Sequence, residues 1–68
     1  MRVAKVSEVL ASSPTSFDDA IRTGLARASK TLRNLKSAWV EGQQVKLDGK
    51  GQIIEYRVQL KVTFAVED

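Results

Sequence analysis

Residues 52–66, QIIEYRVQLKVTFAV, are the stretch that decides the fold. The even-numbered positions from Ile54 to Val66 are all apolar or aromatic, whereas the odd-numbered positions from Glu55 to Thr63 are all polar. Because successive side chains of a strand point to opposite faces, this period of two predicts a half-buried antiparallel strand. At roughly 3.3 Å per residue the strand would span about 50 Å, well over twice the usual length. We therefore expect it to curl around another element or to run past its own subunit.

The residues just before this stretch predict the other half of a hairpin. Asp48-Gly49-Lys50-Gly51 is typical of a tight turn, since its glycines can adopt positive φ. Residues 37–47 predict the preceding strand, but the apolar positions are even before Gly42 and odd after it. A bulge at Gly42 would exchange the two faces of that strand.

The first half of the chain predicts one strand and one helix. Residues 3–10, VAKVSEVL, are rich in valine and predict a short strand, which the Ser- and Pro-rich segment 12–16 would end. Ser16 is a good N-cap with Asp19 three residues later. Apolar residues then recur every three or four positions from Phe17 to Leu35, which predicts a helix ending near residues 33–35. We expect one α+β domain over residues 1–68, with the order βαββ and a three-stranded antiparallel sheet curved around one helix.

Length and composition bear on assembly. A chain of 68 residues buries only about 60% of its unfolded surface, and without Cys or His it has neither disulfides nor the commonest zinc ligands. The exposed edges of a three-stranded sheet invite pairing with other copies, so we expect a homo-oligomer.

The chain has no apolar run long enough to cross a membrane and no signal-peptide pattern at its start, and we expect a soluble, cytoplasmic protein without a membrane partner.

Several function classes find little support in the residues. Without His or Cys the usual nucleophile–base pairs are missing, and no Gly-rich phosphate loop is present, so we do not expect an enzyme. The net charge of +3 allows a nucleic-acid partner, but the 11 basic residues are interleaved with 8 acidic ones and never form a run of three. We therefore expect a solvated surface of mixed charge. A small nucleic-acid-binding module is the alternative.

Trp39 is the most informative single residue. It is the only Trp and stands just after the predicted helix. It is either a core or interface aromatic, or a flat surface on which a planar ring system can stack. In the second case, side chains able to donate to ring carbonyls or to a phosphate are available nearby: Gln43, Gln44, Lys46, Arg57 and Gln59.

Four segments in register, TSFDDAI (15–21), LARASKTLRNL (25–35), AWVEGQQV (38–45) and EYRVQLKVTFAVED (55–68), resemble the dodecins, a family of small flavin-binding proteins. The resemblance covers residues 3–68. It implies the βαββ fold with a long curved sheet that wraps partly around the helix, and a homo-dodecamer in the form of a hollow sphere. It also implies flavins stacked in pairs against the Trp that follows the helix, with a role in binding, storing and quenching flavin.

Carried over to this chain, the resemblance implies a flavin site made by Trp39 with Val40 beside it, Arg57 and Gln59 at the polar edge of the ring, and Lys46 near the ribityl or phosphate end. FMN is the expected cofactor, with riboflavin or FAD as alternatives. Arg57 stands where the family often has Gln, so a cation replaces a neutral amide.

Some bacterial members of the family also hold coenzyme A on the outer surface. Arg27, Thr31 and Arg33 match that pattern, as does Glu67 near the C-terminus. The alternative for Arg27 and Arg33 is a solvated helix surface. Two other possibilities stay open for the whole protein, namely a structural shell without flavin and a coenzyme A-binding oligomer.

Overall fold

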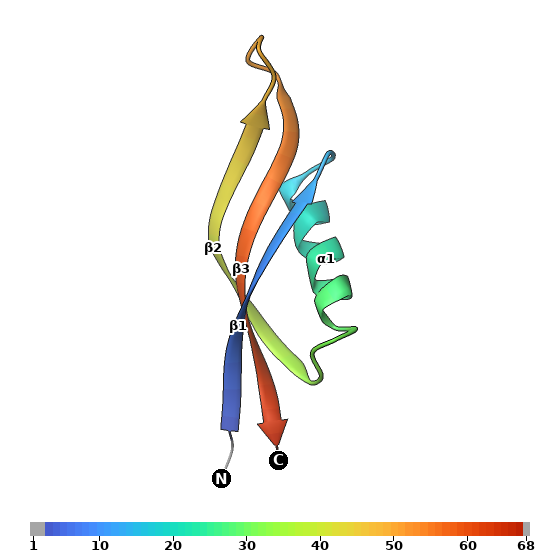
Figure 1. Cartoon of the computed structure of the whole chain (residues 1–68), viewed down its shortest axis with the longest axis vertical. Coiled ribbons are helices and arrows are strands. Elements are labelled where there is room, and N and C mark those ends of the chain that lie inside the picture. Colours follow the sequence, from blue (N-terminus) through green and yellow to red (C-terminus); the bar gives the residue numbers. More distant parts are fainter. Residues whose placement is uncertain (1–2, 68) are drawn as a thin grey trace.

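The computed structural model describes residues 3–67 and has the order β1 (Val3–Ser13), α1 (Phe17–Ala28), β2 (Leu35–Leu47) and β3 (Ile53–Glu67). β3 lies in the centre of a three-stranded sheet of order β1-β3-β2 and is antiparallel to both neighbours. The helix packs on one face of the sheet, and the β2–β3 hairpin extends well beyond it (Figure 1). The predicted α+β class and βαββ order are confirmed.

The helix begins where the sequence predicts and ends earlier. The Ser16 hydroxyl accepts the backbone N–H of Asp19 at 2.9 Å, as an N-cap should. At the other end the helix stops at Ala28, so the predicted end near residues 33–35 is wrong. The hydroxyls of Ser29 and Thr31 donate to the carbonyls of Ala26 and Ala28, which satisfies groups that another helical turn would have used.

A turn connects the helix to the sheet, and β2 begins earlier than the predicted residue 37. Asn34 adopts a positive φ of 61°, and Leu35, predicted on the helix stripe, is the first residue of β2. β1 is also longer than predicted, because its residues pair with β3 as far as Ser13 opposite Tyr56.

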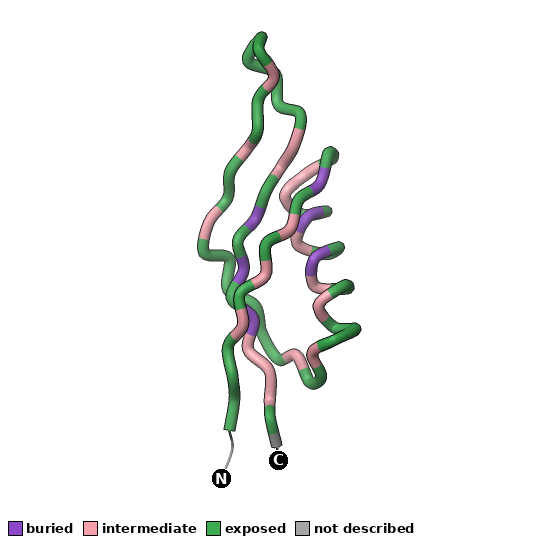
Figure 2. The backbone as a smooth tube through the Cα atoms, in the orientation of Figure 1, coloured by how far each residue is buried: buried purple, intermediate pink, exposed green. Residues whose placement is uncertain are grey.

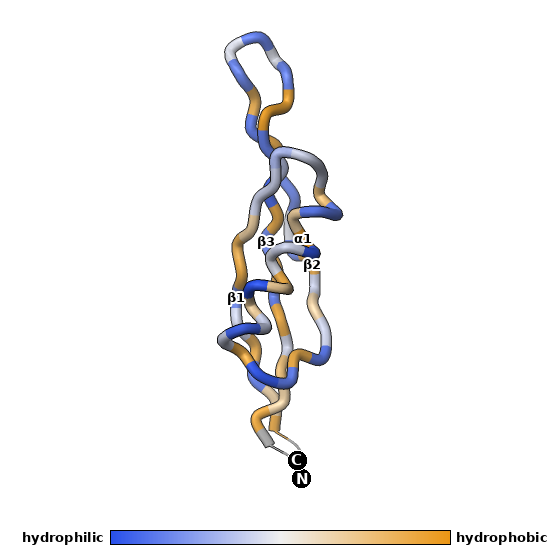
Figure 3. Tube along the Cα trace, turned by 90° about the vertical axis from the view of Figure 1, so that its right-hand side faces the viewer, coloured by the Kyte–Doolittle hydropathy of each residue, from blue (hydrophilic) through white to orange (hydrophobic). Residues whose placement is uncertain are grey.

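The hairpin and its bulge follow the prediction. The Asp48 carboxylate accepts the backbone N–H groups of Lys50 and Gln52 at 2.7 and 3.0 Å, and Gly51 has a φ of 82°. The register shifts between Val40 and Gly42, so one extra residue bulges from β2 there. Hydrophobic and hydrophilic residues alternate along β3, and the hairpin tip is hydrophilic (Figure 3).

The core is small and lies under the helix. Its fully buried apolar residues are Ala20, Val58, Leu60 and Val62. Gly24 brings the helix close to β1, since a Cβ placed on it would lie 2.7 Å from the Ala11 Cβ. The Cα trace measures 53 × 19 × 14 Å, so the helix covers only the middle of β3, and both ends of the strand are largely exposed or half-buried (Figure 2).

In the described part of the chain, α1 is too short and too polar to cross a membrane.

Candidate functional site

The sheet face opposite the helix collects polar side chains from all three strands. Cross-strand partners lie on the same face, so the register defines this surface. We call it the open face. Its members are Glu8, Leu10 and Ser12 from β1, Trp39, Gly42, Gln44 and Lys46 from β2, and Glu55, Arg57, Gln59 and Lys61 from β3.

Trp39 stands on the open face directly opposite Lys61. It is 70% exposed and therefore takes no part in the core of the chain. A large aromatic side chain in this position has its ring surface available for a ligand or for another copy of the protein.

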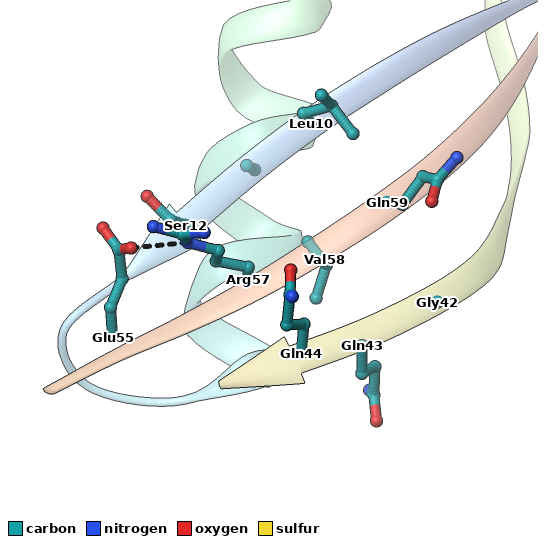
Figure 4. A pocket seen from close by; sticks show the side chains of 10 residues that line it. Leu10, Ser12, Gly42, Gln43, Gln44, Glu55, Arg57, Val58 and Gln59 are labelled. Carbon is teal, nitrogen blue, oxygen red and sulfur yellow. Dashed lines mark hydrogen bonds and ion pairs between the residues drawn. The ribbon is translucent and has the colours of Figure 1, made fainter. Parts of the chain in front are cut away.

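A groove of about 710 Å³ lies on the open face (Figure 4). Trp39 does not line it, but the register places Trp39 next to Gly42, which does. The volume of the groove is in the range of small-molecule sites. Arg57 and Gln59 of β3 form its floor, and Gln44, Gly42, Leu10 and Ser12 line its sides. The structure thus brings together two of the predicted flavin residues, Arg57 and Gln59, on the face that carries Trp39.

The guanidinium of Arg57 is held by a neighbouring carboxylate. Its Nε donates to Glu55 Oε1 at 2.6 Å, and Figure 4 shows the guanidinium turned toward Glu55 and Ser12 and away from Gln59. The hydrogen bond from Arg57 is the main reason why the pKa of Glu55 lies below its usual range, and the charge of Lys46 acts in the same direction. Glu55 therefore stays ionised at neutral pH, and Arg57 is not a free cation.

The carboxamide of Gln59 is also fixed, from the other side of the groove. Its Nε2 donates to the carboxylate of Glu8 on β1. Next to it, Lys61 Nζ lies 3.5 Å from Glu41 Oε1, so the cation opposite Trp39 has an acidic partner. On the open face, charged and amide side chains therefore pair with one another, and the exposed side chains of Trp39 and Leu10 stand among them.

A family model for dodecins matches residues 3–67. The chain belongs to the dodecin family. It is 37% identical over 68 residues to the dodecin of Thermus thermophilus, covering 98% of this chain and 96% of the relative. It is 34% identical over 64 residues to the calcium dodecin of Mycobacterium tuberculosis, covering 94% of this chain and 89% of the relative. The solved structure of dodecin from Streptomyces davaonensis superposes with a TM-score of 0.91 at 36% identity, covering 98% of this chain and 97% of the other.

The two remaining flavin candidates of this dodecin lie at different distances from the groove. Lys46 is on the open face opposite Glu55, nearer the hairpin tip, and is not among the groove's lining residues. Val40 pairs with Leu60 and is therefore on the helix side of the sheet. The structure does not bring the Val40 side chain to the face that carries Trp39.

A second groove, of about 560 Å³, runs between β1 and α1. Arg27 and Thr31 line it together with Thr23, Glu8 and Ser12. Arg33 is not one of its lining residues, because the chain has already left the helix and turned toward β2. The side chain of Glu67 lies outside the described part of the structure.

The sequence did not predict three residues of the site in this dodecin: Glu55 and Gly42, which line the groove, and Glu8, which pairs with Gln59. Glu8 and Glu55 are isolated in sequence and meet the site only through the strand order β1-β3-β2, which the sequence leaves open. Gly42 was identified as a bulge, and the same parity change could have placed it on the face of Trp39.

Within residues 3–67, no group of three or more His, Cys, Asp or Glu side chains is positioned to hold a metal ion.

Proposed function

We propose that this dodecin binds a flavin, FMN before riboflavin or FAD, and that it stores the flavin and quenches its excited state without turning over a substrate. The observation that carries this proposal is the exposed Trp39 on the same sheet face as the groove over Arg57 and Gln59. An indole offers a stacking surface for the ring, and the side chains of the groove offer hydrogen bonds for its polar edge.

The residues present suit such a ligand. Gly42 leaves the groove open on the side toward Trp39, since a Cβ there would fill space now free above the sheet. Arg57 supplies a guanidinium for a ring carbonyl or a phosphate, provided that it leaves Glu55 or shares its remaining N–H groups. Stacking on the indole gives a route for electron transfer from Trp39 to an excited ring, which would explain quenching.

We also propose that the working form is a homo-oligomer, and by family resemblance a dodecamer. Within the described part of the chain the core has four buried apolar residues, which is small for independent stability. Large apolar side chains remain exposed away from the helix, at both ends of the sheet and along its open face: Val6, Leu10, Leu47, Ile53, Ile54 and Val66. Another copy that covers them would also close the groove over a stacked ring.

The test is a titration of FMN with purified apo-protein, followed by flavin emission. We expect strong quenching that saturates near one flavin per chain. Trp39→Ala should weaken FMN binding at least about tenfold, since the stacking contact is lost. Val40→Ala is the matched control, because its side chain lies on the other face of the sheet.

An unchanged FMN affinity in Trp39→Ala would overturn the stacking site. A protein that quenches no flavin yet elutes as a large particle would instead be a structural shell. A protein that ignores flavin but loses affinity for nucleic acid steeply with salt would be a nucleic-acid-binding module.

Coenzyme A is the second candidate ligand, favoured by the groove in which Arg27 and Thr31 meet. Calorimetric titration with coenzyme A tests it. Arg27→Ala should abolish binding, whereas Arg22→Ala should not, because Arg22 is paired with Asp18 on the helix surface away from that groove. Equal heats from the two variants would remove this candidate.

A further inference from the structure

The side of the groove formed by β2 has a gap at Gly42, where a side chain is missing for a reason that backbone geometry does not explain. Among the described residues, positive φ occurs at Asn34 and Gly51 and not at Gly42. A Cβ on Gly42 would have one neighbour within 4 Å, Gln59 Oε1 at 3.8 Å, which is ordinary contact. An alanine would therefore fit both the backbone and the space. Glycine inside a strand often marks a place where a ligand approaches closely.

The gap lies next to the exposed indole. The bulge between Val40 and Gly42 puts Trp39 and Gly42 at successive positions of the open face. Their partners on β3 are Lys61 and Gln59, two residues or about 7 Å apart. A planar ring stacked on the flank of Trp39 would thus stand with its edge over Gly42.

The amide facing this gap has a fixed orientation. The carboxylate of Glu8 can only accept, so the Gln59 nitrogen must face it. The Gln59 oxygen consequently lies on the side of β2, over Gly42, as Figure 4 shows. The gap therefore presents a hydrogen-bond acceptor. Gln44, the next residue of the open face, offers a carboxamide that can donate beside it.

We propose that Gly42 is the seat of the ring and that Gln59 Oε1 accepts a hydrogen bond from an imide N–H on the ring's edge. This proposal rests on the proposed flavin function and deepens it. The isoalloxazine ring carries one such N–H between two carbonyls, so an acceptor flanked by a donor is complementary to it. Glu8 is then a positioning residue, which acts on the ligand only through Gln59.

The acceptor is tested first on the unchanged protein with two ligands, lumiflavin and its N3-methyl derivative. Methylation removes the N–H and leaves the stacking surface intact. We expect the methylated ring to bind about tenfold more weakly, because the acceptor over Gly42 is left unpaired. Equal affinity for the two ligands would overturn the acceptor role of Gln59.

Glu8→Ala then tests the positioning role. With Glu8 removed the amide of Gln59 can rotate, so the preference for lumiflavin over the methylated ring should fall toward one. Glu41→Ala is the matched control, because it removes a carboxylate of the same sheet that pairs with Lys61 rather than with Gln59. A preference that survives in Glu8→Ala would show that Glu8 does not orient the site.

Gly42→Leu tests the seat itself. The new side chain would occupy the space of the ring, and we expect FMN affinity to fall at least about tenfold. Gly49→Leu is the control, since Gly49 lies in the hairpin turn with nothing within 4 Å of a Cβ. Particle size and thermal midpoint show whether each variant is folded. If Gly42→Leu does not fold, the ligand pair on the unchanged protein decides.

The outcomes separate the two proposals. Failure of the unchanged protein to bind any flavin would overturn the proposed function and the seat with it. Normal flavin binding by the unchanged protein together with full FMN affinity in folded Gly42→Leu would overturn the seat alone.

Discussion

The two faces of the sheet have opposite characters although one strand, β3, supplies the centre of both. On the helix side Val58, Leu60 and Val62 are almost completely buried. On the open face Arg57, Gln59 and Lys61 of the same strand each pair with a glutamate, and Trp39 is 70% exposed. The period of two in β3 thus places the buried residues that stabilise the chain on one face and the exposed residues that can bind a ligand on the other.

This separation has a physical consequence. A binding site is most precise when its side chains stand on a rigid element, and here the packing under the helix keeps that element in place from behind. Substitutions on the helix side should therefore act on stability, and substitutions on the open face should act on binding.

The largest contrast is between two leucines on opposite faces. Leu60→Ala removes a side chain that is 0% exposed and should lower the free energy of unfolding by about 2–5 kcal/mol. Leu10→Ala removes one that is 74% exposed in the single chain and should change the stability of the chain by itself by less than about 0.5 kcal/mol, whereas a second copy seated on the open face, as in the proposed oligomer, would raise this loss. Chemical denaturation of both variants measures the difference. A large loss in Leu10→Ala would mean that another copy covers the open face and that this face contributes to stability.

Gly24→Ala tests how closely the helix lies on β1. In an ordinary helix this change is stabilising by up to about 1 kcal/mol. Here the new Cβ would lie 2.7 Å from the Ala11 Cβ, so the helix must move away from the sheet. We expect a net loss of about 1–3 kcal/mol in the free energy of unfolding. The pair Gly24→Ala with Ala11→Gly should recover part of it, and a stabilised Gly24→Ala would contradict the close contact.

Much of this architecture could be predicted from the sequence because its signals are local. The period of two in β3, the cap at Ser16 and the parity change at Gly42 depend only on neighbouring residues, and all three are confirmed. The helix end was missed because the apolar spacing continues to Leu35. The helix ends before that point, where the hydroxyls of Ser29 and Thr31 donate to backbone carbonyls. Such side-chain hydrogen bonds compete with those of the backbone, and the spacing of apolar residues does not reveal them.

The site was predicted less completely because it depends on strand order. Trp39, Arg57 and Gln59 were named from the residues and from the family resemblance, and the register places them on one face. Glu8 reaches Gln59 only because β1 lies beside β3, across 51 residues of chain. Which side of β3 each neighbouring strand takes is a tertiary choice that the pattern of either strand alone does not encode.

The two glycines of the hairpin turn should differ in how much an alanine substitution lowers the stability, by less than in the pairs above. Gly51 has a φ of 82°, so Gly51→Ala should cost about 1 kcal/mol of stability. Gly49 has no such φ and no neighbour within 4 Å of a Cβ, so Gly49→Ala should be close to neutral. Thermal unfolding of the two variants checks this. Equal midpoints would show that the turn relaxes freely, which its position beyond the helix would allow.

The smallest effect should come from titration on the open face. The pKa of Glu55 lies below its usual range near 4.5, chiefly because Arg57 donates to it, so the folded state favours the ionised carboxylate. Its contribution to stability is thus complete above the ordinary pKa and is lost as the pH falls through the lowered value. The same holds for Asp48 at the hairpin, where the N–H groups of Gln52 and Lys50 lower the pKa.

Glu55→Gln should therefore remove part of the fall in thermal midpoint that the unchanged protein shows below about pH 4.5. The effect should be small, because the pair is exposed, and it should shrink further in high salt, which screens it. Leu60→Ala should lower the midpoint at every pH and leave its acid dependence unchanged, because its loss lies on the uncharged face. An acid dependence identical in Glu55→Gln and the unchanged protein would mean that Arg57 does not hold Glu55 in solution. Arg57 would then be free for a phosphate or a ring carbonyl without first giving up a partner.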